Sequence, residues 1–146
     1  MKPSDELLQF EKKFHQRRLR IADSDTWTLS VRPEQITMGN MVLACRSGAS
    51  SMAGLSAEEA HGMAVGFALA ERLAKDVLGA QRVNYLCLMM QDPIVHFHIL
   101  PRYEVPVTRY GRLWEDMDWP APPTIAPVRT DDEVLERIRD DLSNGL

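Results

Sequence analysis

Apolar and polar positions alternate most regularly at residues 94–100 of the chain. β-Branched and aromatic residues dominate this stretch, and a proline closes it, so the pattern predicts a strand. Successive side chains of a strand point to opposite faces. One face would carry Ile94, His96, His98 and Leu100. The two imidazoles then converge on one point, where one can act as nucleophile or base while the other donates a hydrogen bond.

Helical spacing of apolar residues predicts one long helix before this strand. Ser56 and Glu59 form a capping box at its start, and Gly79 is placed to end it. The apolar positions between them are Met63, Phe67, Ala70, Leu73, Ala74 and Val77. Shorter helices are expected at both ends of the chain, one from the N-cap Ser4 to about Phe14, the other over 131–142 behind a capping box that begins at Thr130.

Other apolar runs predict four more strands, at residues 18–22, 27–32, 41–46 and 83–90. A tight turn at 91–93 would pair the last of these with 94–100 as an antiparallel hairpin. Strands, one long helix and again strands indicate an α+β fold, with the helix packed on a mostly antiparallel sheet of about five strands. Prolines make regular structure unexpected over 104–128. We expect one domain over 1–146, with a core at about 18–103 and a C-terminal extension at 104–146.

Composition and charge narrow the classes of protein that the chain can belong to. A net charge of −4 argues against a protein that binds nucleic acid in a groove. No apolar run approaches the ~18 residues of a membrane span, and no signal peptide is visible. The two cysteines lie in apolar runs, which is typical of a reducing compartment. We therefore expect a cytoplasmic protein that binds neither nucleic acid nor membranes.

The residues around the histidine pair resemble the histidine triad (HIT) family of nucleotide hydrolases and transferases. That family carries His-x-His-x-His-x-x-Pro-Arg at the end of a strand. His96 and His98 match its second and third histidines, Pro101 and Arg102 match the trailing Pro-Arg, and Ile94 stands where the first histidine is expected.

Two segments upstream extend the resemblance to about residues 20–103. Gln91 and Asp92 are similar to a polar turn of the family that contacts phosphates. The run Gly39-Asn40-Met41-Val42-Leu43 is similar to the family's Gly-His-x-Leu-Val strand, with Asn40 in the position of the histidine.

The resemblance implies a chemistry in which His96 attacks the α-phosphorus of a nucleotide. A covalent nucleotidyl-histidine forms, and water then hydrolyses it. His98 would hydrogen-bond a phosphate oxygen or the leaving group. The substrate-binding residues would be Gln91, Asn40, Arg102 and Asp92. Ile94 cannot orient His96 as a histidine would, but a backbone carbonyl near His96 could still hold its tautomer.

Substrates and partners follow from the same resemblance. Dinucleoside polyphosphates, such as diadenosine tetraphosphate, or nucleoside phosphoramidates would be hydrolysed or would donate a nucleotidyl group. The reaction would need no cofactor beyond a divalent cation bound to the substrate's phosphates. The chain would form a homodimer through the long helix and neighbouring strands.

Two other functions remain open at this stage. The chain could bind nucleotides with little or no turnover, or it could hold a metal with His96, His98 and Asp92, although zinc usually takes a fourth ligand. The supporting residues also have structural interpretations: Gln91 and Asp92 as turn formers, Asn40 in a left-handed turn, and Arg102 as the partner of a carboxylate. Trp114 and Trp119 could cover a nucleobase or pack on a partner subunit.

Overall fold

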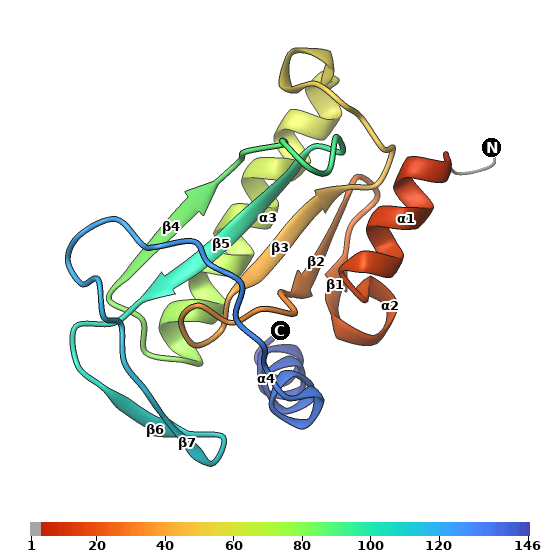
Figure 1. Cartoon of the computed structure of the whole chain (residues 1–146). Helices are drawn as coiled ribbons and strands as arrows, with labels where there is room; N and C mark the ends of the chain where they lie inside the picture. The colour runs from red at the N-terminus through yellow and green to blue at the C-terminus, as the bar shows by residue number, and fades with distance from the viewer. Residues whose placement is uncertain (1–3) are drawn as a thin grey trace.

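A five-stranded antiparallel sheet forms the centre of the computed structural model, which describes residues 4–146 (Figure 1). The strands are β1 (Arg20–Asp23), β2 (Trp27–Val31), β3 (Met41–Cys45), β4 (Arg82–Leu86) and β5 (His96–Arg102), and their order across the sheet is β1-β2-β3-β5-β4. All neighbouring pairs are antiparallel. The predicted α+β fold with about five strands is confirmed.

Helix α3 (Ala57–Asp76) covers one face of this sheet (Figure 1). Its capping box is formed as predicted: Ser56 Oγ accepts from Glu59 N and Glu59 Oε1 accepts from Ser56 N, both at 3.0 Å. Gly79 ends the helical region with a φ of +74°. Apolar side chains of the helix pack against Leu43, Phe97 and neighbouring sheet residues to form the main core.

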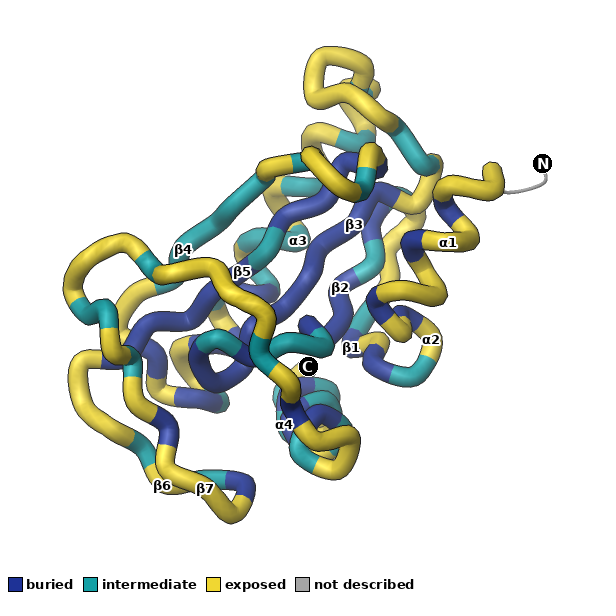
Figure 2. The backbone as a smooth tube through the Cα atoms, viewed as in Figure 1, coloured by how far each residue is buried: buried dark blue, intermediate teal, exposed yellow. Residues whose placement is uncertain are grey.

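The opposite face of the sheet carries the histidines. Helix α1 (Asp5–Lys13) covers part of it, with Ser4 as the predicted N-cap. Phe10 and Phe14 pack there on Val42, Ala44 and Ile94. The segment 115–131 crosses the same face before helix α4 (Asp132–Asn144) (Figure 1). Strand β3 is buried along its whole length (Figure 2), so the site stands on a rigid base.

The predicted tight hairpin between β4 and β5 is wrong in its connection. The strands do pair, from Arg82 opposite Arg102 to Leu86 opposite His98. Strand β4 then ends at Leu86, and residues 87–95 form a loop in which Met89 has a φ of +52°. Val95 hydrogen-bonds to Ala49 O and Cys45 N, so the chain leaves the β4 ladder before the strand resumes at His96.

The far end of β5 also differs from its prediction, because the strand continues through Pro101 to Arg102. The β3 ladder ends opposite Ile99, so Pro101 has only one neighbouring strand and its missing N–H costs no bond on the other side. Residues 18–19 belong to a short helix, α2 (Gln16–Leu19), instead of a strand.

The C-terminal region also differs from its prediction. Strands β6 (Val107–Arg109) and β7 (Arg112–Trp114) form a hairpin where no regular structure was expected. Its turn, Tyr110-Gly111, has two positive φ angles, which matches the twist of a two-residue hairpin. The predicted capping box of α4 is absent: Asp131 is the N-cap, and Thr130 Oγ1 accepts from Gln35 N. Over residues 4–146, none of the helices combines the length and apolar character that crossing a bilayer requires.

Candidate functional site

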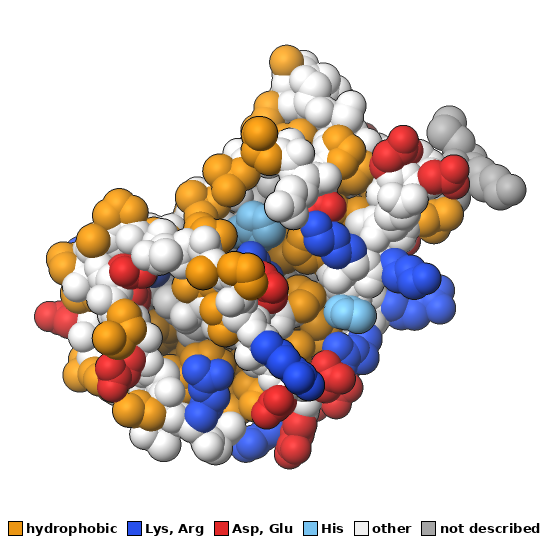
Figure 3. All heavy atoms as spheres, in the orientation of Figure 1, with side chains coloured by type: hydrophobic (Ala, Val, Ile, Leu, Met, Phe, Trp, Pro, Cys, Tyr) orange, Lys and Arg blue, Asp and Glu red, His pale blue; other side chains and the backbone are white. Residues whose placement is uncertain are grey.

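A cavity of about 540 Å³ opens over the histidine face of the sheet. Its walls come from the end of α1, the loop after β2, the loop 87–95, strand β5 and the crossing segment at Ile125, Ala126 and Pro127. Figure 3 shows this face, with hydrophobic, basic and acidic side chains gathered around a hollow. Of the site residues predicted from the sequence, the cavity is lined by His96, His98, Gln91 and Asp92, but not by Asn40 or Arg102.

The two imidazoles lie side by side on β5, as the alternation of the strand predicts. Their ring centroids are 5.0 Å apart and their planes are nearly perpendicular, at 84°. His96 is 3% exposed. Phe10 and Phe14 of the α1 region lie 4.9 and 5.8 Å from the His96 ring. Aromatic packing therefore restricts the motion of the buried imidazole.

His96 is held in one tautomer by the backbone. Its Nδ1 lies 2.6 Å from the carbonyl oxygen of Ile94. A carbonyl can only accept, so Nδ1 carries the proton and Nε2 keeps a lone pair. Burial lowers the pKa of His96 and outweighs the opposing effect of the Ile94 hydrogen bond. The ring is therefore neutral at neutral pH, with Nε2 as the nitrogen available to a ligand.

His98 is held in the opposite tautomer by a side chain. Arg32 Nε donates to His98 Nδ1 at 3.1 Å. Arginine has no acceptor, so Nδ1 of His98 must be unprotonated and Nε2 carries the proton. Burial, together with the charge of Arg32, lowers the pKa of His98 to about 3. The cavity wall thus presents a nitrogen lone pair from His96 beside an N–H donor from His98.

Two basic residues of the cavity were missed as site residues. Lys13 Nζ lies 2.7 Å from Asp92 Oδ2 and ties α1 to the loop 87–95. Lys13 belongs to a group of basic residues at positions 12–20, and in the sequence such a group is typical of a solvent-exposed helix end. Arg32 is buried directly after an apolar strand, where a charged side chain is rare. A charge in such a position is the one sequence feature that could have marked Arg32 as a site residue.

Asn40, which the resemblance places among the substrate-binding residues, does not line the cavity. Its side chain is fully buried, and its Oδ1 accepts from the backbone N–H groups of Ile36 at 2.6 Å and Thr37 at 3.1 Å. The left-handed conformation belongs to its neighbour Gly39, with a φ of +85°. Asn40 therefore holds the loop between β2 and β3 in shape.

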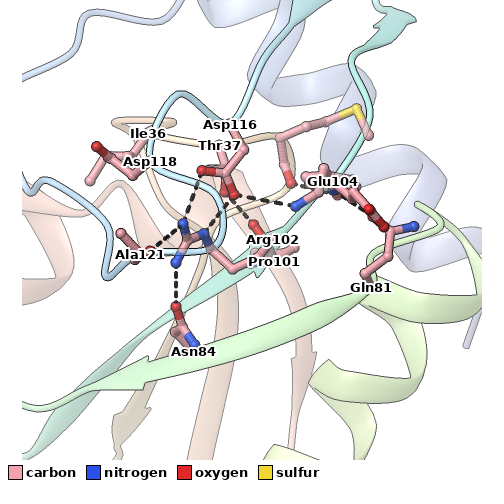
Figure 4. Close-up of polar contacts among 12 residues, drawn as sticks. Ile36, Thr37, Gln81, Asn84, Pro101, Arg102, Glu104, Asp116, Asp118 and Ala121 are labelled. Atoms are coloured by element: carbon pink, nitrogen blue, oxygen red, sulfur yellow. Dashed lines mark hydrogen bonds and ion pairs between the residues drawn. The ribbon is translucent and has the colours of Figure 1, made fainter.

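Arg102 also lies outside the cavity and is fully engaged by the protein (Figure 4). Its Nε and Nη2 donate to the two carboxylate oxygens of Asp116 at 2.6 and 3.0 Å, while Nη1 donates to Asn84 Oδ1 at 2.8 Å. Nη2 also donates to the carbonyl of Ala121. Arg102 thus anchors the crossing segment to the sheet, which matches its alternative interpretation as the partner of a carboxylate.

The aromatic residues of the C-terminal segment do not line the cavity. Trp114 is buried and donates its indole N–H to the carbonyl of Arg109. Trp119 lies near Arg102, at a second hollow beside β4. The smaller residues Ile125, Ala126 and Pro127 form this part of the cavity wall.

The metal-binding interpretation finds no ligand set in the part of the chain that the structure describes. Within residues 4–146, no group of three or more His, Cys, Asp or Glu side chains is arranged to hold a metal ion. His96, His98 and Asp92 border the same cavity, but Asp92 is engaged by Lys13.

Comparison with known proteins shows which solved structures share this fold. No protein-family model and no curated protein sequence matches this chain. Several solved structures do match it in fold. A HIT-like protein involved in cell-cycle regulation from Bartonella henselae has a TM-score of 0.74 at 15% identity, covering 99% of this chain and 100% of that protein.

Two further solved structures have the same fold. A hypothetical histidine triad nucleotide-binding protein from Sulfolobus tokodaii has a TM-score of 0.66 at 12% identity, covering 86% of this chain and 81% of the other. A zinc-bound histidine triad family protein from Mycobacterium smegmatis has a TM-score of 0.60 at 18% identity, covering 86% and 84%. The chain therefore has the fold of the histidine triad proteins.

Proposed function

We propose that this protein is a nucleotide hydrolase or nucleotidyl transferase that works through a covalent nucleotidyl-His96. Dinucleoside polyphosphates and nucleoside phosphoramidates are the proposed substrates. One observation carries the proposal: the two neighbouring imidazoles are held in opposite tautomers, so a nucleophilic nitrogen stands beside a hydrogen-bond donor in one cavity. The fold, shared with a hypothetical histidine triad nucleotide-binding protein from Sulfolobus tokodaii, supports the nucleotide as ligand.

In the first step, the Nε2 lone pair of His96 forms a bond to the α-phosphorus. The bond from phosphorus to the leaving group breaks, and its electron pair departs with that group. The Nε2–H of His98 hydrogen-bonds a phosphoryl oxygen or the departing atom and stabilises its developing charge. His96 needs no base, because its Nε2 is already unprotonated.

The intermediate places a positive charge on the His96 ring, which now carries a proton on Nδ1 and phosphorus on Nε2. The Ile94 carbonyl faces that N–H at 2.6 Å and stabilises the charge. Water then attacks phosphorus, the N–P bond breaks, and its electron pair returns to Nε2. One proton of the water is released, and the original tautomer is restored.

Gln91 is proposed to contact the phosphate chain through its amide, and Asp92 only through a divalent cation bound to those phosphates, since both border the cavity beside the histidines. A divalent cation bound to the substrate's own phosphates is compatible with these carboxylate and amide oxygens. Asn40 and Arg102 have no place in this proposal, because their polar groups are engaged away from the cavity.

A homodimer is proposed on the free edge of β4 and the outer side of α3. Strand β4 has only one neighbour in the sheet, and the exposed side of α3 includes Ala64, Val65 and Ala68. An edge strand beside small apolar residues suits self-association. Sedimentation equilibrium tests it, and a monomer at every concentration would contradict it.

The decisive experiment is intact-protein mass spectrometry after a brief acid quench. Wild type, His98→Ala, His96→Ala and the control His61→Ala, an exposed histidine on α3, are each mixed with diadenosine tetraphosphate or a nucleoside phosphoramidate. We expect a nucleotidyl adduct that accumulates in His98→Ala, because later steps slow, and that is absent in His96→Ala. No adduct and no product, together with measurable nucleotide binding, would instead indicate a nucleotide-binding module.

A further inference from the structure

Arg32 is a buried cation in the cavity wall whose bonds within the protein leave part of its guanidinium unused. We propose that Arg32 is the anion-recognition residue of this cavity: its Nη2 edge receives a phosphate of the ligand, while its Nε holds His98 as a donor. The nucleotide as the source of that phosphate rests on the proposed function. The contacts of Arg32 with His98 and with an anion do not rest on the proposed function, and each can be tested separately.

The backbone holds Arg32 firmly in place. Directly after β2, its N–H donates to the carbonyl of Asn40 at 2.8 Å, and its carbonyl accepts from Gln35 Nε2 at 2.7 Å. Gln35 itself is 1% exposed. The arginine side chain is 9% exposed. A side chain anchored in this way is preorganised, so little conformational entropy is lost when it binds a ligand.

The guanidinium has three distinct nitrogens, and their partners differ. Nε donates to His98 Nδ1 at 3.1 Å, and Nη1 donates to the carbonyl of Glu34 at 2.6 Å. Nη2 has only an ion pair with Glu34 Oε2 at 3.7 Å, which is longer than a hydrogen bond. Among residues 4–146, no acceptor is hydrogen-bonded to Nη2, although Arg32 lines the cavity.

A buried charge with so distant a counter-ion favours an incoming anion. Burial lowers the pKa of Arg32, and the opposing effect of Glu34 does not restore it. The carboxylate of Glu34 is 45% exposed, so water screens its charge. A phosphate oxygen within hydrogen-bond distance of Nη2 would compensate the cation better than this carboxylate does.

The position of His98 favours a tetrahedral anion such as phosphate over a planar one. His98 Nε2–H and Arg32 Nη2 border the same cavity and both donate. Lys13 adds a second cation from α1. Donors from several directions suit the tetrahedral oxygens of a phosphate, each of which can accept from a different side. A planar carboxylate, with only two oxygens, would accept from fewer of these donors.

Arg32 is also a positioning residue for His98. Its N–H forbids a proton on Nδ1 of His98, and its charge disfavours the imidazolium. Without Arg32, His98 could carry its proton on Nδ1 and turn an acceptor toward the cavity. The donor needed beside His96 would then be lost even in a folded protein.

The positioning role is tested by ¹⁵N NMR of the histidine rings in the free protein, which reports tautomer and protonation without any turnover. We compare wild type, Arg32→Met, Arg32→Lys and Arg17→Met, the last removing the same charge from an exposed position outside the cavity. In wild type and Arg17→Met, His98 should show the Nε2–H tautomer at neutral pH. In both Arg32 variants the Nδ1–H form should appear. A wild-type His98 spectrum in Arg32→Met would overturn this role.

The anion role is tested by calorimetric titration with AMP, adenosine and inorganic phosphate. Arg32→Met should weaken AMP about tenfold or more, as expected for one lost charged hydrogen bond, and leave adenosine unchanged. Arg32→Lys should retain part of the AMP affinity, because it keeps the charge. Equal losses for AMP and adenosine, or AMP affinity unchanged in Arg32→Met, would overturn the role.

The two tests separate this proposal from the proposed function. If wild type forms no nucleotidyl adduct, the proposed function fails. If Arg32→Met nevertheless loses AMP affinity and the Nε2–H tautomer of His98, the proposed role of Arg32 still holds. A wild-type protein that binds neither AMP nor inorganic phosphate refutes the anion role. The unfolding transition of each variant is compared with wild type, so that a loss of fold is recognised, and Arg32→Lys serves where Arg32→Met does not fold.

Discussion

The backbone carbonyl of Ile94 lies 2.6 Å from Nδ1 of His96. This hydrogen bond fixes the tautomer that a nucleophilic Nε2 requires, and it comes from the residue that the resemblance to the family aligns with the first triad histidine. The Ile94 side chain itself is 2% exposed and packs with Phe10, Phe14, Val42 and Ala44. The tautomer of His96 is therefore set by the backbone at position 94 and needs no hydrogen bond from the side chain there.

Ile94→His should consequently not accelerate turnover. The imidazole would enter an apolar cluster without a hydrogen-bond partner among the cluster's own side chains, and we expect the free energy of unfolding to fall by about 2–3 kcal/mol. Urea unfolding and steady-state turnover measure the two effects. The control, Ile94→Val, should cost about 1 kcal/mol and leave turnover as in wild type. Faster turnover in Ile94→His than in wild type would show that the Ile94 carbonyl does not suffice to orient His96.

Local signals explain why α3 and the histidine pair could be predicted. Ser56 and Glu59 are three residues apart, and Gly79 stops the helix through its own backbone freedom. His96 and His98 share a face because the alternation of a strand is a local property. Each of these inferences needs only neighbouring residues.

Contacts between distant residues explain what could not be predicted. The loop 87–95 departs from β4 because Val95 bonds to Ala49 O and Cys45 N, which no pattern within the loop encodes. Lys13 reaches Asp92 across 79 residues, and Arg32 reaches His98 across 66. Arg102 matches a family motif, yet its partner Asp116 lies in a segment with no pattern of its own. Tertiary packing decides all of these.

Stability should depend on pH through His98. Burial and Arg32 lower its pKa in the folded protein to about 3, whereas an unfolded histidine titrates near ~6.5. Between these values the unfolded state binds more protons, so the free energy of unfolding decreases as pH falls, by at most about 1.4 kcal/mol per pH unit. His96, whose pKa is also lowered, adds to the slope.

Urea unfolding between about pH 5.5 and 7.5, above the range of ordinary carboxylates, measures this slope. His98→Gln should have a smaller slope than wild type, because one proton-linked group is gone. Arg32→Met should reduce it as well, since His98 regains part of its ordinary pKa. Identical slopes in wild type and His98→Gln would contradict the lowered pKa.

The ion pair of Arg102 and Asp116 should matter more for stability than for ligand binding, because it reaches the cavity only through the crossing segment that it anchors. Their side chains are 4% and 2% exposed. Burial raises the pKa of Asp116, but hydrogen bonds from Arg102 and the Tyr103 backbone outweigh it and lower that pKa. Asp116→Ala leaves a buried guanidinium without its carboxylate, which should cost about 3–5 kcal/mol in the free energy of unfolding.

Chemical unfolding and AMP titration together check this assignment. At a temperature where Asp116→Ala is folded, its free energy of AMP binding should change far less than its free energy of unfolding, because Arg102 does not line the cavity. A selective loss of AMP affinity with little loss of stability would place Arg102 in the substrate site, as its match to the family motif first indicated.

Lys13 and Asp92 should affect ligand affinity in opposite directions. Their ion pair is partly exposed, 49% and 20%, so Lys13→Met should change the free energy of unfolding by less than about 1 kcal/mol. As a cation on the cavity wall, however, Lys13 favours a bound phosphate. Lys13→Met should weaken AMP and Asp92→Asn should strengthen it, each by about 1 kcal/mol and less at high salt.

Titrations with AMP at low and high ionic strength decide between two roles for Asp92. Removing a negative charge that only neutralises Lys13 must help an anion to bind. If Asp92→Asn instead weakens AMP, its carboxylate must accept a hydrogen bond from the ligand itself, and the predicted substrate contact of Asp92 would hold. Adenosine, which carries no phosphate, serves as the matched ligand: the electrostatic role leaves its affinity unchanged in both variants, whereas a direct contact with the ribose would lower it in Asp92→Asn.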